Sequence, residues 1–310
     1  MISDELDVGV FGDYISSVMN RHVVVALLLA VLVTSTAGAA DIVRGDIVRS
    51  ADPPAIMCPT PPRTAVLSSS LDFKSWLWTG DAVAFDSVGN LYAAGQTTLE
   101  SFDSTLQTIR KIDLGEKVTA LAVDAAGFAY VVTHGGTTVV VSPGGAVQRS
   151  FVLPNLHTPV DSTSIDVTPA ACTLVYIGDG ASLNRFDVCA QIALGPIAAG
   201  ERFEAVRALS DGGVVAATAG LIKFYDSNGS LRYSVAAPAG GPIAALSFDL
   251  DDHSLWIANG EFLVRMNIFT QAITARTRIL NPRAVAVFGE RRLSSANVST
   301  VVPPRHRASR

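Results

Sequence analysis

Charged residues and cysteines are scarce in this sequence, and their scarcity excludes several classes of protein. Of the 310 residues, 16% are charged, 49% are hydrophobic and three are cysteine. Disorder over most of the chain is excluded, because so apolar a chain can bury enough surface to offset the entropy lost on folding. A coiled coil is excluded because it needs an excess of Ala, Glu, Lys, Leu and Arg.

Basic charge and nucleotide-binding motifs are also lacking. The formal net charge is -5 at pH 7, whereas nucleic-acid-binding domains carry a basic surface, so nucleic acid is not an expected partner. The sequence contains no glycine-rich phosphate-binding loop, no Gly-x-Ser-x-Gly nucleophile motif and no Cys-x-x-Cys pair. Nucleotide binding, serine-nucleophile chemistry and a structural zinc site are therefore not predicted.

The apolar run near the amino terminus, Val23–Val33, is too short to span a membrane. It has eleven residues, whereas a transmembrane helix needs about 20. Arg21 precedes it and the small residues 36–40 follow it, which is the pattern of a secretory signal peptide. We therefore expect residues 1–39 to be an amino-terminal extension and signal peptide, with no transmembrane helix in the mature chain. A buried strand or helix at 23–33 is the alternative.

The first eighteen residues do not fit that signal. They carry four acidic side chains and no basic one, whereas a signal peptide begins with positive charge. Met19 would begin a normal signal, so we expect the true start there and the mature chain to begin near Ala40. Export of this kind predicts a secreted, periplasmic or cell-surface protein.

Two landmarks recur in step along the rest of the chain. The first is the position that ends a short apolar run, at residues 86, 124, 168, 209, 249 and 288, spaced by 38 to 44 residues. The second is a polar turn that follows 17 to 19 residues later, at residues 103, 142, 187, 226 and 267. The first of these positions is Asp at residues 86, 124 and 249, whereas Thr168 and Leu209 depart from that pattern. A period of this length indicates a propeller or another stacked array.

Each repeat reads as four short strands. In the second repeat these are Thr119–Val123, Phe128–Thr133, Thr137–Ser142 and Val147–Leu153, separated by glycine-containing turns. The runs are rich in β-branched residues and too short for helices. A small four-stranded sheet cannot bury both faces alone, so the repeats are expected to stack in a ring as the blades of an all-β propeller.

Five repeats are complete, and the sixth has only its first strand near Arg283–Phe288. Apolar runs at 41–48 and 64–67 are expected to supply its missing strands. The prediction is six four-stranded blades over residues 41–289, closed by joining the amino- and carboxyl-terminal segments. Residues 290–310 are basic and are expected to form an unordered tail.

Two of the repeats carry a recognisable pattern. Residues 83–93 read V-A-F-D-x-x-G-N-L-Y-A and residues 121–131 read L-A-V-D-x-x-G-x-x-Y-V. This pattern resembles NHL-type repeats and is similar to blades of the streptogramin-lyase-like and gluconolactonase-like propellers. The resemblance covers residues 80–288 and rests on turn and core positions, so it implies the architecture and no particular activity.

Cys172 and Cys189 flank a hairpin predicted over Thr173–Val188. The two cysteines lie opposite each other across its paired strands, which predicts a disulfide in an oxidising compartment. Two unpaired thiols are the alternative. Cys58 is left over and is expected to be a free or mispaired thiol.

Candidate functional residues gather in the loops that lead into the innermost strands, which share one face of a propeller and surround the channel mouth. His157 lies near the acids Asp161 and Glu204 in this arrangement and is a candidate general base with them. Asp81, Glu204 and Asn259 are candidate oxygen ligands for Ca²⁺ or another divalent cation. The alternative for each of these residues is an ordinary polar residue in a solvated surface loop.

The repeat pattern predicts the fold clearly, but the sequence shows no recognisable set of catalytic residues. The expected function is an exported, non-catalytic module that binds a protein or a small-molecule or carbohydrate ligand, or that acts as a scaffold. The alternative is a metal-dependent hydrolase or lyase, similar to a lactonase, with its site at the channel mouth.

Overall fold

A computed structural model gives the fold of most of the repeat region. It describes residues 40–43, 47–50, 64–68, 82–103, 107–161, 163–169, 172–178, 182–198, 200–251, 253–279 and 282–299. No helix in these described ranges is long and apolar enough to cross a membrane.

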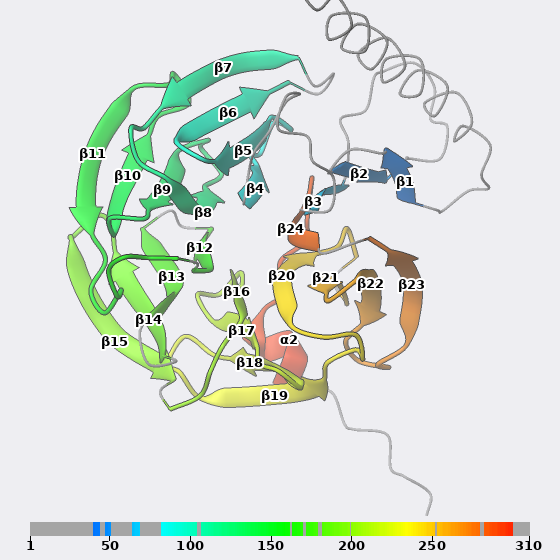
Figure 1. The fold of residues 1–310 in the computed structure, drawn as a ribbon. Coiled ribbons are helices and arrows are strands. Elements are labelled where there is room, and N and C mark those ends of the chain that lie inside the picture. The colour runs from blue at the N-terminus through cyan, green and yellow to red at the C-terminus, as the bar shows by residue number, and fades with distance from the viewer. Residues whose placement is uncertain are drawn as a thin grey trace, which may run out of the picture.

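The described residues form five four-stranded antiparallel blades arranged around a centre (Figure 1). Blade 1 contains β4 (Ala82–Phe85), β5 (Leu91–Gly95), β6 (Thr98–Phe102) and β7 (Thr108–Asp113). Blade 2 contains β8 (Val118–Val123), β9 (Ala129–Thr133), β10 (Thr137–Val141) and β11 (Val147–Val152). Blade 3 contains β12 (Ile165–Val167), β13 (Thr173–Gly178), β14 (Ser182–Asp187) and β15 (Ile192–Ala198).

Blade 4 contains β16 (Ala205–Ala208), β17 (Val214–Ala217), β18 (Leu221–Tyr225) and β19 (Leu231–Ala236). Blade 5 contains β20 (Ile243–Phe248), β21 (Ser254–Asn259), β22 (Phe262–Asn267) and β23 (Ile273–Arg278). In every blade the strands pair in sequence order, with the first strand innermost (Figure 1). This confirms the predicted all-β propeller.

The aspartates of the first landmark shape the turn after the innermost strand. Asp86 Oδ1 accepts hydrogen bonds from the backbone N–H groups of Val88 at 3.0 Å and Asn90 at 2.8 Å. Asp124 Oδ1 accepts the same pair from Ala126 and Phe128, both at 2.9 Å. A carboxylate that captures backbone N–H groups in this way fixes a tight turn. The repeated aspartate is therefore a structural residue of the blade.

The second landmark has the same role at the turn before the outermost strand. Asp226 Oδ1 accepts from the backbone N–H groups of Asn228 and Ser230, and Ser142 Oγ accepts from that of Ala146. Gly229 and Gly145 follow with φ of 85° and 86°, a conformation that glycine adopts without strain. Both landmarks thus encode hairpin turns, which explains why they recur in step.

Apolar contacts between neighbouring blades form the core. The buried Tyr92 of blade 1 reaches blade 2, where its hydroxyl donates to Gly127 O at 3.3 Å. Tyr176 of blade 3 donates to Pro154 O at 2.7 Å, in the loop that leaves blade 2. Burial raises the pKa of Tyr92 to about 12. Buried apolar clusters join blades 1 and 2, 2 and 3, 3 and 4, and 4 and 5, so each of these blades packs against the next, as a stacked array requires.

The sixth position of the ring, between blades 5 and 1, does not hold the predicted four-stranded blade. Here β24 (Pro282–Val287) pairs with β3 (Thr64–Ser68) in a two-stranded sheet, with Val285 opposite Val66. A second two-stranded sheet joins β1 (Ala40–Val43) to β2 (Ile47–Ser50), and β2 lies against β3. The described residues thus contain five four-stranded blades and not six, because no continuous hydrogen-bonded ladder unites these four strands.

β24 nevertheless closes the ring of innermost strands between blades 5 and 1. Its Ala284 and Ala286 pack with Val83 of blade 1, and its Val285 and Val287 pack with Trp256 of blade 5. Figure 1 shows β3 beside β24 at this position. The prediction that the chain ends meet thus agrees with the pairing of β24 and β3.

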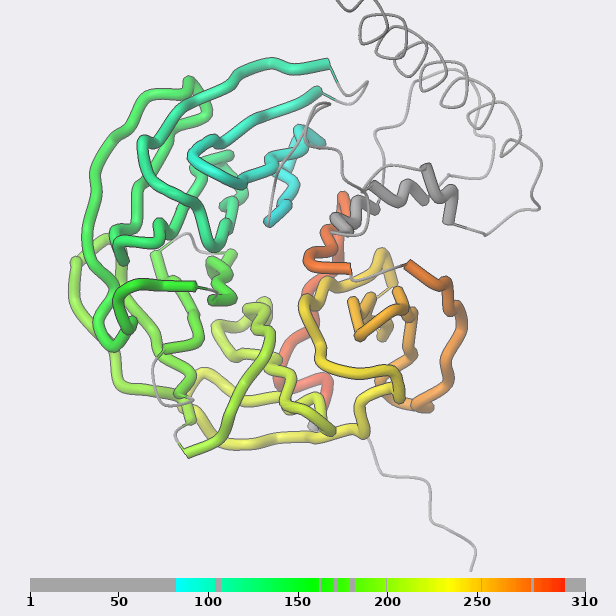
Figure 2. Tube along the Cα trace, in the orientation of Figure 1, coloured from blue at the N-terminus to red at the C-terminus, as the bar shows by residue number. Residues whose placement is uncertain are grey.

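Residues 290–299, the first part of the segment expected to be an unordered tail, lie against the propeller, and residues 300–310 lie outside the described residues. We refer to residues 290–299 as the strap; it ends in α2 (Ser295–Ser299). Leu293 and Val298 of the strap are buried in the core of blades 4 and 5. Asp211 Oδ2 accepts hydrogen bonds from Ser294 Oγ at 2.8 Å and Ser295 Oγ at 2.7 Å. Figure 2 shows the strap passing from the centre toward blade 4.

The predicted disulfide is confirmed. Cys172 and Cys189 are bonded, with their Cα atoms 5.3 Å apart. They flank β13 and β14, which pair from Thr173 opposite Asp187 to Gly178 opposite Ser182. The other cysteine, Cys58, and the predicted signal peptide lie outside the described residues.

Candidate functional site

The catalytic candidates His157 and Asp161 lie in the loop between blades 2 and 3. Both are exposed. Asp161 Oδ1 is 3.9 Å from Nδ1 of a different histidine, His134, whose Nδ1 is also 3.0 Å from Val160 O. The structure thus places Asp161 beside a histidine that the sequence analysis did not pair with it.

Glu204 and Asn259 serve as hydrogen-bonding residues within the fold. Glu204 Oε2 accepts from the backbone N–H of Ile243 at 2.8 Å and so ties blade 4 to blade 5. Asn259 is fully buried, and its Nδ2 donates to Pro238 O at 2.6 Å. Its Oδ1 is buried without a hydrogen-bond partner. Asp81, the third metal-ligand candidate, lies outside the described residues.

Among the described residues, no group of three or more His, Cys, Asp or Glu side chains is arranged so that it could hold a metal ion. A divalent cation at Asp81, Glu204 and Asn259 stays a prediction.

One cavity of the described residues lies where the innermost strands end, whereas Glu204 and Asn259 lie where β16 and β20 begin. The volume of this cavity is about 450 Å³. Its apolar walls include Phe85, Val123, Val167 and Val287, one from each of four positions around the ring. Its charged lining residues are Asp86, Asp124, Arg207, Glu290 and Arg292.

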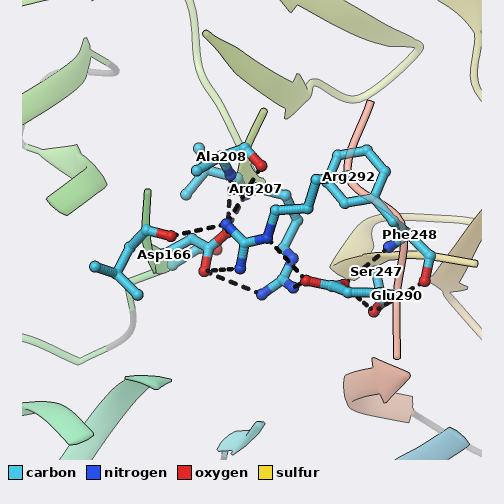
Figure 3. A network of polar contacts seen from close by, with 10 residues as sticks. Asp166, Arg207, Ala208, Ser247, Phe248, Glu290 and Arg292 are labelled. Carbon is cyan, nitrogen blue, oxygen red and sulfur yellow. Dashed lines mark hydrogen bonds and ion pairs between the residues drawn. The ribbon is translucent and has the colours of Figure 1, made fainter. Parts of the chain in front are cut away.

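A network of two arginines and two carboxylates occupies the centre of the channel beside this cavity (Figure 3). Asp166 comes from β12 and Arg207 from β16, whereas Glu290 and Arg292 come from the strap. Blade 3, blade 4 and the strap therefore meet at this network. Two positive and two negative charges balance, which is what a buried ionic cluster requires.

Arg207 bridges the two carboxylates. Its Nη1 donates to Asp166 Oδ1 at 3.2 Å, and its Nη2 donates to Glu290 Oε1. Its Nε is buried and has no hydrogen-bond partner. Arg207 also lines a smaller cavity of about 80 Å³ on the other side of the network. Arg207 thus contacts both cavities of the channel.

Arg292 contacts the same two carboxylates from the strap. Its Nη1 lies 3.0 Å from Asp166 Oδ2 and its Nη2 lies 3.2 Å from Asp166 Oδ1, while its Nε donates to Glu290 Oε1 at 3.0 Å. Nη1 also donates to Val167 O at 2.7 Å. Such two-pronged contact between a guanidinium and a carboxylate fixes geometry as well as charge.

Glu290 and Arg207 are held in their ionised forms. Burial alone would raise the pKa of the Glu290 carboxyl, but the neighbouring Arg207 and Arg292 outweigh it, so that pKa lies below its usual value. Burial would lower the pKa of Arg207, but Asp166 and Glu290 outweigh it and raise that pKa. Both groups are therefore charged at neutral pH.

Sequence reasoning did not identify this network, although a signal for it exists. Arg207 and Asp166 each stand within the short apolar run of an innermost strand, Ala205–Ala208 and Ile165–Val167. A charged residue at such a position must find a partner, because an unpaired buried charge is costly. The partners in the strap were missed because the strap was expected to be an unordered tail.

Comparison with known proteins supports the architecture and goes no further. No family model matches the sequence, and no curated protein matches it. Among solved structures, a chain of hydrazine synthase from Kuenenia stuttgartiensis aligns with a TM-score of 0.54 at 12% identity, covering 71% of this chain and 93% of that one. At this identity the likeness shows the β-propeller fold alone.

A protein of unknown function from Bacteroides caccae also aligns with this chain. Its TM-score is 0.46 at 15% identity, and the alignment covers 61% of this chain and 72% of that one.

Proposed function

We propose that this chain is a non-catalytic binding module, which holds a small ligand in the cavity of its channel. The observation that carries the proposal is the position of that cavity against the ionic network. Its volume of about 450 Å³ lies within the range of small-molecule sites, roughly 300–1,000 Å³. It combines apolar walls with a few converging charged groups, which is the usual composition of such sites.

The state of the charged groups supports binding over catalysis at this place. A general acid or base works best when its pKa lies near the working pH. The pKa of Glu290 is instead lowered by Arg207 and Arg292, and that of Arg207 is raised by its carboxylate partners. Both groups are thereby kept from exchanging protons at neutral pH.

The proposal includes export to an oxidising compartment. The Cys172–Cys189 disulfide supports it, because disulfides persist in secreted and periplasmic proteins and are rare in the cytosol of most organisms. Expression of the full sequence in a bacterial host, followed by amino-terminal sequencing of the exported protein, tests it. A mature terminus near Ala40 is expected, whereas an uncleaved cytosolic product contradicts export.

The binding proposal is tested by saturation-transfer NMR of the purified protein with a mixed set of neutral, acidic and basic small molecules. Ala125 lines the cavity, is exposed and lies in the turn after β8. Ala125→Trp should fill the cavity and abolish the transfer signals. Ala126→Trp is the matched control, since Ala126 is an exposed neighbour in the same turn that does not line the cavity.

Two results overturn this function. If no compound binds, or if binding survives in Ala125→Trp, the cavity is not the site. If a bound compound is converted to a product at a rate that Ala125→Trp abolishes, the module is catalytic.

A further inference from the structure

We propose that the cavity selects an organic cation, a molecule with an apolar body and a protonated amino group that donates hydrogen bonds. This ligand class rests on the proposed function, because that function makes the cavity a ligand site. Two buried carboxylates, those of Asp86 and Asp124, line the cavity and are 7% and 4% exposed. Among the residues that the structure describes, neither of them forms an ion pair with a basic side chain.

The two aspartates lie on neighbouring turns at one side of the cavity. Asp86 follows β4 of blade 1, and Asp124 follows β8 of blade 2. Ser87 Oγ donates to Ala125 O at 2.6 Å, and this hydrogen bond joins the two turns. Burial raises the pKa of the Tyr92 hydroxyl to about 12, and the charges of Asp86 and Asp124 both add to that rise. Both carboxylates therefore lie near one hydroxyl and act on the same region.

Each carboxylate keeps acceptor capacity on its second oxygen. Oδ1 of each is occupied by the two backbone N–H groups of its turn. Oδ2 of Asp86 accepts from Asn90 Nδ2 at 2.7 Å, and Oδ2 of Asp124 accepts from the Tyr130 hydroxyl at 3.3 Å. A carboxylate oxygen has about two lone-pair sites. Each Oδ2 can therefore accept a further hydrogen bond from a ligand.

Other turn-forming aspartates of the propeller do have basic partners. Asp249 stands at the same landmark in blade 5, and its Oδ2 accepts from Arg265 Nε. Asp226 forms a turn at the second landmark, and its Oδ2 accepts from Arg232 Nε at 2.7 Å. A buried carboxylate is costly unless it is paired. The two aspartates beside the cavity lack the cation that these other two have, and a bound ammonium group would supply it.

Two arginines of blades 1 and 2 contact other groups near these turns. Arg110 Nη1 donates to Pro143 O at 3.1 Å. Arg149 forms a hydrogen bond with the hydroxyl of Tyr130, which in turn donates to Asp124 Oδ2. A neutral hydroxyl thus lies between Arg149 and the carboxylate, and neither arginine replaces a direct cationic partner.

The arginines of the ionic network do not supply the missing charge either. Arg207 and Arg292 are balanced by Asp166 and Glu290, which they contact directly. The carboxylates on the turns of blades 1 and 2 therefore leave the cavity with net negative charge. A ligand carboxylate would be repelled there, because like charges interact strongly in a site of low dielectric. A ligand ammonium group would be attracted.

The remaining lining fits an apolar body attached to that ammonium group. Phe85, Val123, Val167 and Val287 contribute apolar side chains from four positions around the ring. Apolar contact supplies most of the affinity of small ligands, and a few polar groups fix their orientation. Such walls give no ligands to a bare metal ion, which is bound by oxygen, nitrogen or sulfur atoms. The lining therefore favours an organic cation over a metal ion.

Three probes that share one ring separate the ligand classes. Benzylammonium carries a charged donor, benzyl alcohol carries a neutral hydroxyl in its place, and benzoate carries the opposite charge. Each is titrated into the full-length protein by NMR at neutral pH. We expect benzylammonium to bind about tenfold more tightly than benzyl alcohol, since a charge-assisted hydrogen bond exceeds a neutral one by about that factor. Benzoate should bind most weakly. Binding should be lost in Ala125→Trp and kept in Ala126→Trp.

Asparagine variants test the two carboxylates. The double variant Asp86→Asn, Asp124→Asn removes both charges, while an asparagine oxygen can still hold each turn. It should weaken benzylammonium binding about tenfold and leave benzyl alcohol binding unchanged. Asp103→Asn is the matched control. Asp103 Oδ1 accepts from the backbone N–H of Gln107 at 2.9 Å in another turn of blade 1, but Asp103 does not line the cavity.

If the double variant does not fold, the carboxyl ¹³C resonances of the unmodified protein serve instead. Those of Asp86 and Asp124 should shift when benzylammonium is added, whereas that of Asp103 should not. Unmoved resonances of Asp86 and Asp124 in the presence of bound benzylammonium would overturn the inference.

The outcomes separate this ligand class from the proposed function. Equal or tighter binding of benzyl alcohol or benzoate at the cavity overturns the ligand class and leaves the cavity as a binding site. Absence of benzylammonium binding also overturns the ligand class, whereas the mixed compound set decides whether the cavity binds at all. An unchanged benzylammonium affinity in the double variant removes the two carboxylates as its partners and overturns the inference.

Discussion

Asp166 and Arg292 are 126 residues apart in the sequence, yet both oxygens of the carboxylate lie within 3.2 Å of the guanidinium nitrogens. The pair joins the innermost strand of blade 3 to the strap, which follows the strand that closes the ring. Its side chains are largely buried, so the attraction is weakly screened by solvent. The pair thus fixes the start of the strap against blade 3.

Removing Arg292 should be strongly destabilising. Arg292→Met leaves Asp166 and Glu290 with one cation between them, and breaking a buried ion pair typically costs about 3–5 kcal/mol. Urea unfolding measures the loss. Arg278→Met is the control, because Arg278 and its partner Glu261 are exposed, and such pairs are worth about 0–1 kcal/mol. Similar losses in the two variants would contradict the importance assigned to the buried network.

The free energy of unfolding should fall on acidification, because Glu290 and Asp211 become protonated. The pKa of each carboxyl is lowered in the folded protein: burial opposes the shift in both, but two arginines outweigh it at Glu290 and hydrogen bonds from Ser295 and Ser294 outweigh it at Asp211. A depressed folded pKa stabilises the protein above the unfolded pKa, and this stabilisation is lost as the pH falls through the folded one.

The unfolded values are 4.5 for Glu290 and 3.8 for Asp211. Thermal unfolding between pH 7 and pH 3 should therefore show a constant contribution down to about pH 5 and a decline below it. Glu290→Gln should flatten that decline, whereas Glu261→Gln, at an exposed site, should not. A decline that is identical in Glu290→Gln assigns the acid sensitivity to other groups.

The strap should contribute to stability through its buried leucine. Leu293 is 1% exposed within the core of blades 4 and 5. Leu293→Ala should cost about 2–5 kcal/mol, the range for a buried leucine. The matched control is Leu231→Ala on the outer strand of blade 4, where the leucine is 52% exposed and the expected change is within about 0.5 kcal/mol. Denaturant unfolding measures both losses. Equal small losses in the two variants would show that the strap does not contribute to stability.

Loss of the disulfide should destabilise blade 3. Its cysteines are 17 residues apart, and closing a loop of that length stabilises by about 3 kcal/mol in the chain-entropy account. Replacing Cys172 and Cys189 by Ala should lower the unfolding free energy by that order and speed hydrogen exchange in β13 and β14. Cys58→Ala serves as the control. Unchanged exchange in β13 and β14 would show that the bond does not hold this hairpin.

Removal of β3 should open the ring at the sixth position. β24 is paired with β3 from Pro282 opposite Ser68 to Val287 opposite Thr64. A chain that begins after residue 68 lacks this partner and should melt at a lower temperature than a chain that begins at residue 40. Equal melting temperatures would show that β24 closes the ring through its contacts with β4 and β20 alone.

The sequence by itself determined the features that depend on local chemistry. Asp86 and Asp124 revealed the repeat, because a carboxylate captures backbone N–H groups two and four residues away whatever the rest of the chain does. The Cys172–Cys189 bond was predictable because its two ends face each other across one hairpin. Blade architecture followed from these periodic turns, since a small sheet must stack to bury its faces.

Only the tertiary structure decided what depends on distant segments. Arg207 meets Glu290 from 83 residues away, and no local pattern connects them, because the pairing arises only when the ring brings the strap across the channel. The structure of the sixth position likewise depends on the pairing of β24 with β3 and on the separate β1–β2 sheet, which involve segments far apart in the sequence. Local hydrogen bonds set the blade, whereas long-range packing and charge neutralisation set the channel and its cavity.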